Sequence, residues 1–95
     1  MKDFARNQWE RAQRTLKTAV ALIESDPESA ASRAYYAAFH ALTALFALRS
    51  RSFKKHMALR AALHKELIKT DLWPVELGRD YDFLMDLREI AITAA

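Results

Sequence analysis

The stretch PESAASRAYYAAFHALTALFALR, residues 27–49, decides the fold of this chain. Written as a helix, it is apolar on almost every side, and larger side chains interrupt its alanines: Tyr35, Tyr36, Phe39, Leu42, Leu45, Phe46 and Leu48. A helix that is apolar all round is covered by neighbours on most of its surface. Alanine favours the helix and loses no side-chain entropy on burial, and it lets neighbouring backbones come close. The sequence therefore predicts a central helix from Pro27 to about Arg49.

A second helix is predicted before this central one, from about Lys2 to Ser25. Apolar residues recur in it at spacings of three and four, which is typical of a surface helix with one buried stripe: Phe4, Trp9, Ala12, Leu16, Ala19, Val20 and Ile23. The segment SDPES separates the two helices, because Asp26 can cap the next helix and Pro27 suits its first position. Glu28 then lies where the helix macrodipole favours negative charge.

Two more helices are predicted after the central one. Residues from about Lys55 to Thr70 carry an apolar stripe of Leu59, Ala62, Leu63, Leu67 and Ile68. Pro74 opens a fourth helix from about Val75, which we expect to be buried through Leu77, Tyr81, Leu84, Leu87 and Ala91. Gly78 near its start costs about 1 kcal/mol against alanine, unless a close neighbour needs the space. Short connections favour antiparallel neighbours, so the prediction is an all-α, up-and-down four-helix bundle that forms one domain over residues 1–95.

Composition limits the classes of function. Apolar residues make up 52% of the 95 residues, more than so small a chain can bury internally, so we expect self-association. The chain has no cysteine, which excludes disulfides, thiolate metal sites and a cysteine nucleophile. No apolar run is long enough for a membrane span, and the charged start lacks the apolar core of a secretion signal. These features predict a cytoplasmic protein without a membrane partner.

The charges are unevenly distributed along the chain. No acidic residue lies between Glu28 and Glu66, whereas seven basic residues do: Arg33, Arg49, Arg51, Lys54, Lys55, Arg60 and Lys65. After Glu66 acidic residues predominate. Such an asymmetry can attract a phosphate-bearing partner, or it can pair one segment of the fold with another.

Three residues of the central helix form the first candidate site. Arg33, Tyr36 and His40 are separated by three and four residues, so they share one helix face. Arginine offers phosphate a planar set of donors, tyrosine offers a base a stacking surface, and histidine titrates near neutral pH. One interpretation is therefore a nucleotide-binding or RNA-binding notch. The other is that Arg33 and His40 bond to a neighbouring helix or subunit and fix its register.

His56, Arg60 and His64 form a second candidate, one turn apart on the third helix. With Lys54 and Lys55 they make a cationic stripe near a helix start, which either attracts phosphate or simply faces solvent. The spacing does not match a chelating histidine pair, so no metal is predicted. The sequence shows no Ser-His-Asp relay and no glycine-rich phosphate loop, so no cofactor is predicted, and the carboxylates of the fourth helix read as a solvated face.

Three segments together carry a resemblance to a known family: ASRAYYAAFHALTAL, KKHMALRAALHKELIKT and LWPVELGRDYDFLMDLREIA. They resemble the HEPN superfamily, in particular its small stand-alone prokaryotic branch. The most specific parts are the run from Ser32 to His40, the pair Lys55–His56, and the pair Leu87–Arg88. The resemblance implies a dimeric helical bundle that accompanies a small nucleotidyltransferase, often as a toxin–antitoxin pair.

Many members of this superfamily are metal-independent ribonucleases, in which a late arginine is followed within a few residues by a histidine. Here Arg88 matches that arginine, but EIAITAA follows it and contains no histidine. The leading hypothesis is therefore a catalytically degenerate HEPN-like homodimer that binds a nucleotidyltransferase partner or a nucleotide. Arg33 and His56 would contact phosphate, Tyr36 would offer a flat surface, and Arg88 would lie near the subunit seam.

Two alternatives remain open from the sequence. The first is an RNA-cleaving toxin that uses Arg33 with His40, or Arg88 with a histidine of the other chain. The second is an oligomerising scaffold that binds no small ligand.

Overall fold

The computed structural model describes residues 2–94, and it describes their side chains as far as Ile90. The helices are α1 (Lys2–Leu22), α2 (Pro27–Leu48), α3 (His56–Ala62) and α4 (Val75–Ala94), and a short π-helix, η1 (Leu63–Ile68), continues α3. No strand occurs among residues 2–94. The predicted all-α, four-helix class is therefore confirmed. The predicted burial of Ala91 lies outside the described side chains.

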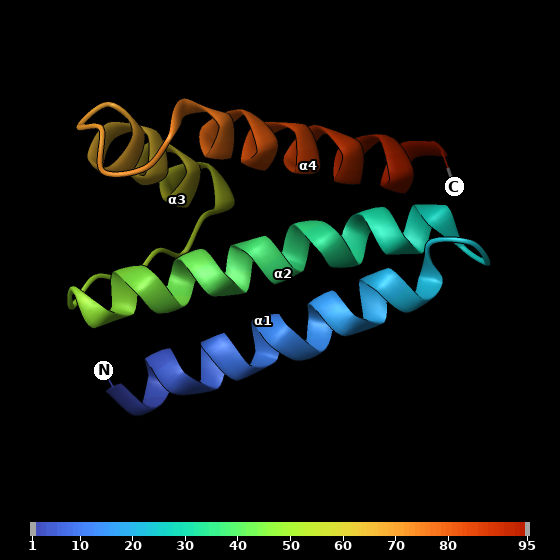
Figure 1. The fold of residues 1–95 in the computed structure, drawn as a ribbon, viewed down its shortest axis with the longest axis horizontal. Coiled ribbons are helices and arrows are strands. Elements are labelled where there is room, and N and C mark those ends of the chain that lie inside the picture. Colours follow the sequence, from blue (N-terminus) through green and yellow to red (C-terminus); the bar gives the residue numbers. More distant parts are fainter. Residues whose placement is uncertain (1, 95) are drawn as a thin grey trace.

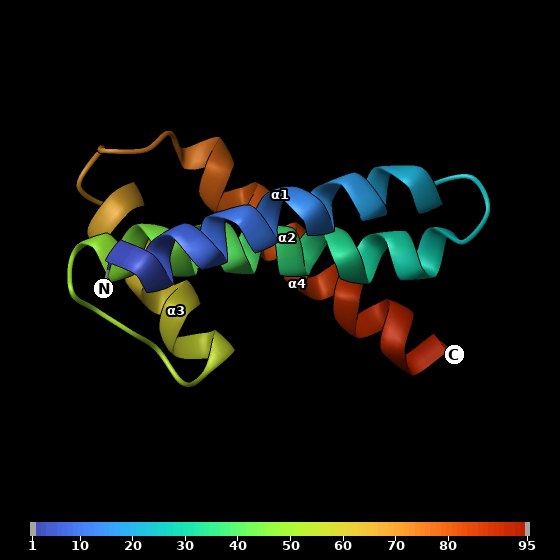
Figure 2. The same ribbon diagram turned by 90° about the horizontal axis from the view of Figure 1, so that it is seen from below.

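Helix α2 lies between α1 and α4, and both neighbours run antiparallel to it (Figure 1). The connector of residues 49–55 turns back along α2, so α3 begins near the middle of α2 and runs toward the end at which α2 stops (Figure 2). Ring contacts agree with this path, because His56 at the start of α3 stacks on Phe39 with centroids 4.4 Å apart. The third helix thus departs from a simple up-and-down order, and it brings His56 to the centre of the molecule.

The core lies between α2, α3, η1 and α4. Its largest fully buried side chains are Tyr35, Phe46, Leu59, Leu63 and Leu67, and Tyr81 and Met85 of α4 join them. The three leucines in this set are spaced by four residues. Because an α-helix has 3.6 residues per turn, leucines at this spacing would drift around the helix and away from the core. The wider turns of η1, in which the Lys69 N–H donates to the His64 carbonyl at 2.8 Å, keep the stripe against the core. This widening was not predicted from the sequence.

The junction between α1 and α2 forms as predicted. Asp26 caps α2, because its carboxylate accepts hydrogen bonds from the Ser29 N–H at 3.2 Å and from the Ser29 hydroxyl at 2.6 Å. These bonds hold the pKa of Asp26 below its usual value. Pro27 occupies the first turn of the helix, where its missing N–H leaves no bond unmade. Helix α1 ends at Leu22, three residues earlier than predicted, and a turn leads to the cap.

Gly78 is required by a close approach of η1 to α4. A Cβ atom at this position would lie 2.9 Å from His64 Cε1 and 3.1 Å from Ile68 Cγ1. The His64 ring has little freedom to yield, since its Nε2 is hydrogen-bonded to Asp82 Oδ1 at 2.9 Å. The space that glycine leaves is thus occupied, which accounts for a residue that otherwise weakens a helix.

The predicted buried stripe of α1 was largely wrong. Ala12 and Ala19 are buried, together with Ala5, but five larger members of the stripe are 44–60% exposed: Phe4, Trp9, Leu16, Val20 and Ile23. The reason is that α1 packs on α2 through its small residues, so the larger apolar side chains flank that contact. Leu77 of α4, predicted to be buried, is likewise 44% exposed.

Two of the basic residues in this uneven distribution, Arg51 and Arg60, pair with carboxylates of the same fold, as one of the two interpretations predicted. Arg51 forms an ion pair with Glu66, and Arg60 Nε lies 2.9 Å from Asp82 Oδ1. The Asp82 pairing corrects two predictions, because Arg60 and His64 do not form a free cationic stripe and this carboxylate is not simply solvated. Within the described part of the chain, none of the helices is both long and apolar enough to cross a membrane.

Candidate functional site

A polar cavity of about 310 Å³ lies between α1 and α2. Six residues line it: Arg11, Thr15, Ser32, Arg33, Tyr36 and His40. The predicted shared face of Arg33, Tyr36 and His40 is therefore present and forms one wall. Two guanidinium groups, two hydroxyls, a phenol and an imidazole line the space, and its lining includes no carboxylate. This set of groups suits an anion rich in oxygen atoms, such as a phosphate.

The two arginines of the cavity come from different helices. Both are exposed, and neither side chain forms an ion pair or a hydrogen bond with another residue of the described chain. Their charges are therefore available to a ligand. Arg11 and Thr15 were not predicted as site residues from the sequence, although their spacing of four puts them on one face of α1. The missing information was which face of α1 meets α2.

His40 stands at the inner end of this wall and is buried. Its Nδ1 lies 2.9 Å from Gln8 Oε1 on α1. Because a carbonyl oxygen only accepts, Nδ1 carries the proton and Nε2 is the free acceptor. Burial lowers the pKa of His40, and the nearby charges of Arg11 and His56 lower it further. His40 thus bonds to a neighbouring helix, as one interpretation of the sequence predicted, and it also faces the cavity.

His56 is held by a chain of two tyrosines. The Tyr81 hydroxyl donates to the Tyr35 hydroxyl at 3.5 Å, and Tyr35 in turn lies 2.6 Å from His56 Nδ1. Burial raises the pKa of Tyr35, so its phenol stays protonated and donates to Nδ1. Burial also lowers the pKa of His56, with a further contribution from Arg88, while Glu89 acts in the opposite direction. His56 is thus a neutral imidazole whose proton is on Nε2.

Tyr36 connects the two histidines with Arg88. Its ring centroid lies 6.3 Å from that of His40 and 5.9 Å from that of His56. The Arg88 guanidinium carbon lies 5.5 Å from the Tyr36 centroid and 5.2 Å from that of Tyr35, which is the range of cation–π contact. Of the four predicted binding residues, Arg33, Tyr36 and His40 line the cavity, whereas His56 does not line it and contacts the Tyr36 ring. The predicted place of Arg88 at a subunit seam stays a prediction.

Arg88 is held in this position mainly by the aromatic rings. Its side chain is 16% exposed, and its Nη1 lies 3.6 Å from Glu89 Oε1. Its Nε is buried and has no hydrogen-bond partner among the residues whose side chains the structure describes. A buried donor without a partner is costly, and an anion that bound nearby would remove that cost.

The lowered pKa values predict that acid destabilises the fold. At pH values below the ordinary histidine pKa of 6.5, the unfolded chain binds protons that the folded His40 and His56 resist. Stability is therefore fully present above that pH and is lost as the pH falls toward about 5. The charged groups that face the pair are Arg11, Arg88 and Glu89, and the carboxylate favours the charged imidazole.

The test is the midpoint of thermal unfolding, measured between about pH 7.5 and 5 for the wild type and for His40→Gln. Glutamine does not titrate, so the variant is expected to lose less stability over this range. Reading the slope rather than the absolute midpoint separates titration from any loss of packing. Equal slopes for the two proteins would show that His40 is protonated as easily in the folded chain as in the unfolded one.

The remaining histidine lies outside this cluster. His64 shares Asp82 with Arg60, and among residues 2–94 no group of three potential ligands gathers in a way that could hold a metal ion.

Comparison with known proteins gives a consistent result. The model of the HEPN domain family matches residues 5–92. A protein of Thermotoga maritima named "UPF0332 protein" is 35% identical over 80 residues, which cover 83% of this chain and 61% of that protein. The chain thus spans about three-fifths of the length of this relative. No solved structure gives a significant match.

Proposed function

Because this chain belongs to the HEPN domain family, we propose that it is a homodimeric HEPN module that binds a nucleotide through the cluster around Tyr36. In this proposal Arg33 and Arg11 hold phosphate and Tyr36 offers a surface for the base, while His56 contacts the Tyr36 ring from outside the cavity. The module acts with a small nucleotidyltransferase in a toxin–antitoxin-type pair, which is the partner that its family resemblance implies.

The observation that carries this proposal is that Arg11 and Arg33 face one cavity and that neither is paired with a carboxylate among the described residues. Arg11 and Arg33 line the same 310 Å³ space with Ser32 and Thr15, and no carboxylate lines it. Guanidinium groups bind phosphate oxygens through several parallel hydrogen bonds, and the two hydroxyls add further donors. Elsewhere the fold neutralises Arg51 and Arg60 with carboxylates, so the absence of such pairing here is consistent with a role in binding.

The proposed module binds without catalysing a reaction. None of residues 89–95 is a histidine, so Arg88 has no partner at the spacing that the ribonucleases of its superfamily use. Arg88 packs against Tyr35 and Tyr36 and holds their rings, which is a positioning role.

The direct test is calorimetric titration of the purified protein with ATP, and with adenosine as the comparison. If phosphate contacts dominate, ATP binds and adenosine does not, and the affinity for ATP falls as the salt concentration rises. Equal affinity for the two compounds, or no binding of ATP, would contradict the proposal. The partner is tested separately, by co-purification with the nucleotidyltransferase encoded beside this gene.

One observation favours the alternative of a metal-independent ribonuclease. His40 is a neutral imidazole whose Nε2 carries no proton, and it lines the cavity together with Arg11 and Arg33. A free imidazole nitrogen can act as the general base that activates the RNA 2′-hydroxyl, and guanidinium groups can stabilise the charge that develops on the phosphate. Cleavage of an RNA substrate in the presence of a chelator, lost in His40→Ala, would favour this alternative over the binding module.

A further inference from the structure

A long apolar groove runs along the side of the molecule that α3 does not cover. Its floor is the alanine face of α2: Ala30, Ala31, Ala34, Ala37, Ala38, Ala41 and Ala44. One wall is formed by α1 and the turn after it: Trp9, Leu16, Val20 and Ile23. The other wall is formed by the turn before α4 and by α4 itself: Trp73, Leu84 and Leu87. Neighbouring hollows share residues such as Trp9, Leu16 and Ala41, so they form one continuous groove.

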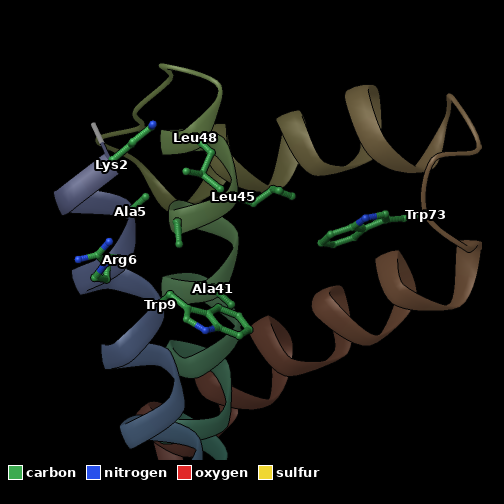
Figure 3. A pocket seen from close by; sticks show the side chains of 9 residues that line it. Lys2, Ala5, Arg6, Trp9, Ala41, Leu45, Leu48 and Trp73 are labelled. Atoms are coloured by element: carbon green, nitrogen blue, oxygen red, sulfur yellow. The ribbon is translucent and has the colours of Figure 1, made fainter.

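The wider end of the groove has a volume of about 570 Å³. Figure 3 shows Trp9 of α1 and Trp73 of the turn before α4 projecting into this space from opposite sides, near Ala41 and Leu45 of α2. Trp9 is 52% exposed and Leu48 is 64% exposed. Large apolar side chains that remain this exposed along one groove mark a surface for another molecule.

The pattern of α1 indicates that this molecule is a helix. Ala5, Ala12 and Ala19 recur every seven residues and pack on α2, where they are at most 5% exposed. Trp9, Leu16 and Ile23 recur with the same period on the neighbouring stripe and are 52–57% exposed. A seven-residue apolar repeat is the pattern by which helices pack lengthwise on one another. Helix α1 thus has one apolar stripe that packs on α2, the occupied seam of Ala5, Ala12 and Ala19. Its second apolar stripe is exposed, and we call it the vacant seam: Trp9, Leu16 and Ile23.

The dimensions of the groove agree with a helical occupant. It follows α2 from Pro27 to Leu48, a helix of 22 residues, which corresponds to about 30 Å at the rise of an α-helix. An alanine floor permits the short interaxial distances of close helix packing, about 8 Å. A small ligand would fill only one of the hollows.

We propose that this groove is the homodimer interface, in which α1 of a second copy lies antiparallel to α1 about a two-fold axis near Leu16. The inference rests on the homodimer of the proposed function and names its surface. In this register Trp9 of one protomer lies opposite Ile23 of its partner, and each α1 covers the groove of the other chain. A two-fold interface uses the same patch on both subunits, and the vacant seam of α1 is self-complementary in this way.

The charges of α1 favour the antiparallel direction. Lys2 and Arg6 border the groove at the start of the helix, whereas Glu24 lies in the turn after its end and Glu28 lies in the first turn of α2. Antiparallel packing places the basic end of one copy beside the acidic end of the other, and parallel packing would place like charges together. Complementary charge of this kind fixes orientation, while the apolar seam supplies the burial.

Disulfide trapping tests the arrangement, because the chain has no cysteine of its own. Under mild oxidation Leu16→Cys is expected to form a covalent dimer, since a residue on the axis meets its own copy within the Cα separation of a disulfide. Trp9→Cys mixed with Ile23→Cys is expected to give the mixed dimer, and neither variant is expected to cross-link by itself. Arg14→Cys, which is exposed on the opposite side of α1, is the matched control for random collisions.

Light scattering of Leu16→Asp provides the second readout. Leu16 is 53% exposed in the single chain, so the protomer is expected to fold while the dimer dissociation constant rises at least tenfold. If the wild type is a dimer but Leu16→Asp remains one and Leu16→Cys cross-links no better than Arg14→Cys, this interface is wrong and the homodimer stands. A wild type that is monomeric at every concentration overturns both. If Leu16→Asp still forms the dimer but no longer binds a different protein that the wild type binds, the groove is the site of that partner and the inference is overturned.

Discussion

Replacing Tyr35 with alanine is expected to lower the free energy of unfolding by about 4 kcal/mol. Tyr35 is fully buried, and its ring contacts those of Tyr36, His56 and Tyr81 and the guanidinium of Arg88. Removing the ring leaves a cavity between α2, α3 and α4, and it also removes the hydroxyl that bonds His56. The loss is a large part of the stability that a domain of this size possesses. Urea unfolding followed by circular dichroism measures it.

The variant Tyr35→Phe separates the hydroxyl from the ring. It keeps the packing but removes two hydrogen bonds, the one to His56 and the one from Tyr81, so its loss is expected to be about 2 kcal/mol, at about 1 kcal/mol for each bond. Without its donor, the proton of His56 is expected to redistribute between the two ring nitrogens, which the nitrogen chemical shifts of the imidazole report. If Tyr35→Ala were as stable as Tyr35→Phe, packing of the Tyr35 ring would not contribute to the free energy of unfolding. An unchanged His56 tautomer in Tyr35→Phe would contradict the proposed hydrogen-bond direction.

The second large effect concerns binding. The double variant Arg11→Gln/Arg33→Gln is expected to weaken the affinity for ATP by about a hundredfold or more. Each guanidinium–phosphate contact contributes about 1.5–3 kcal/mol, and each 1.4 kcal/mol is a factor of ten in affinity. Both side chains are exposed and unpaired among the described residues, so their replacement leaves the fold unchanged. Calorimetric titration measures the change.

Arg14→Gln/Lys17→Gln is the matched control. Both residues are exposed on α1, neither lines the cavity, and the variant has the same reduced net charge. A cavity-specific site predicts that this control binds ATP almost as the wild type does. If both double variants weaken binding equally, the attraction comes from overall charge, and the cavity is not the site.

Much of the fold could be predicted from the sequence because the decisive signals are local. The alanine-rich run of α2, the cap at Asp26 and the proline after it each determine their structure within a few residues. Gly78 also indicated a close contact, although only the structure identifies His64 and Ile68 as its neighbours. The widened turns of η1 depend on tertiary packing of the leucine stripe, and spacing by itself does not reveal them.

The candidate site was predicted in part for the same reason. Arg33, Tyr36 and His40 share a helix, so their spacing shows that they are neighbours. Arg11 and Arg88 approach them from other helices, and nothing in their local sequence indicates which helix faces meet. The exposed seam of α1 was interpreted as core because an apolar stripe has the same pattern whether its partner is this chain or another molecule.

A backbone and side-chain NMR titration of the wild-type protein with ATP tests most directly whether a nucleotide binds in the polar cavity between α1 and α2. We expect the largest chemical-shift changes at Arg11, Thr15, Arg33, Tyr36 and His40, while the indole N–H signals of Trp9 and Trp73 in the groove stay unchanged. Shift changes centred on the two tryptophans, or no saturable change at any residue, would contradict binding in this cavity.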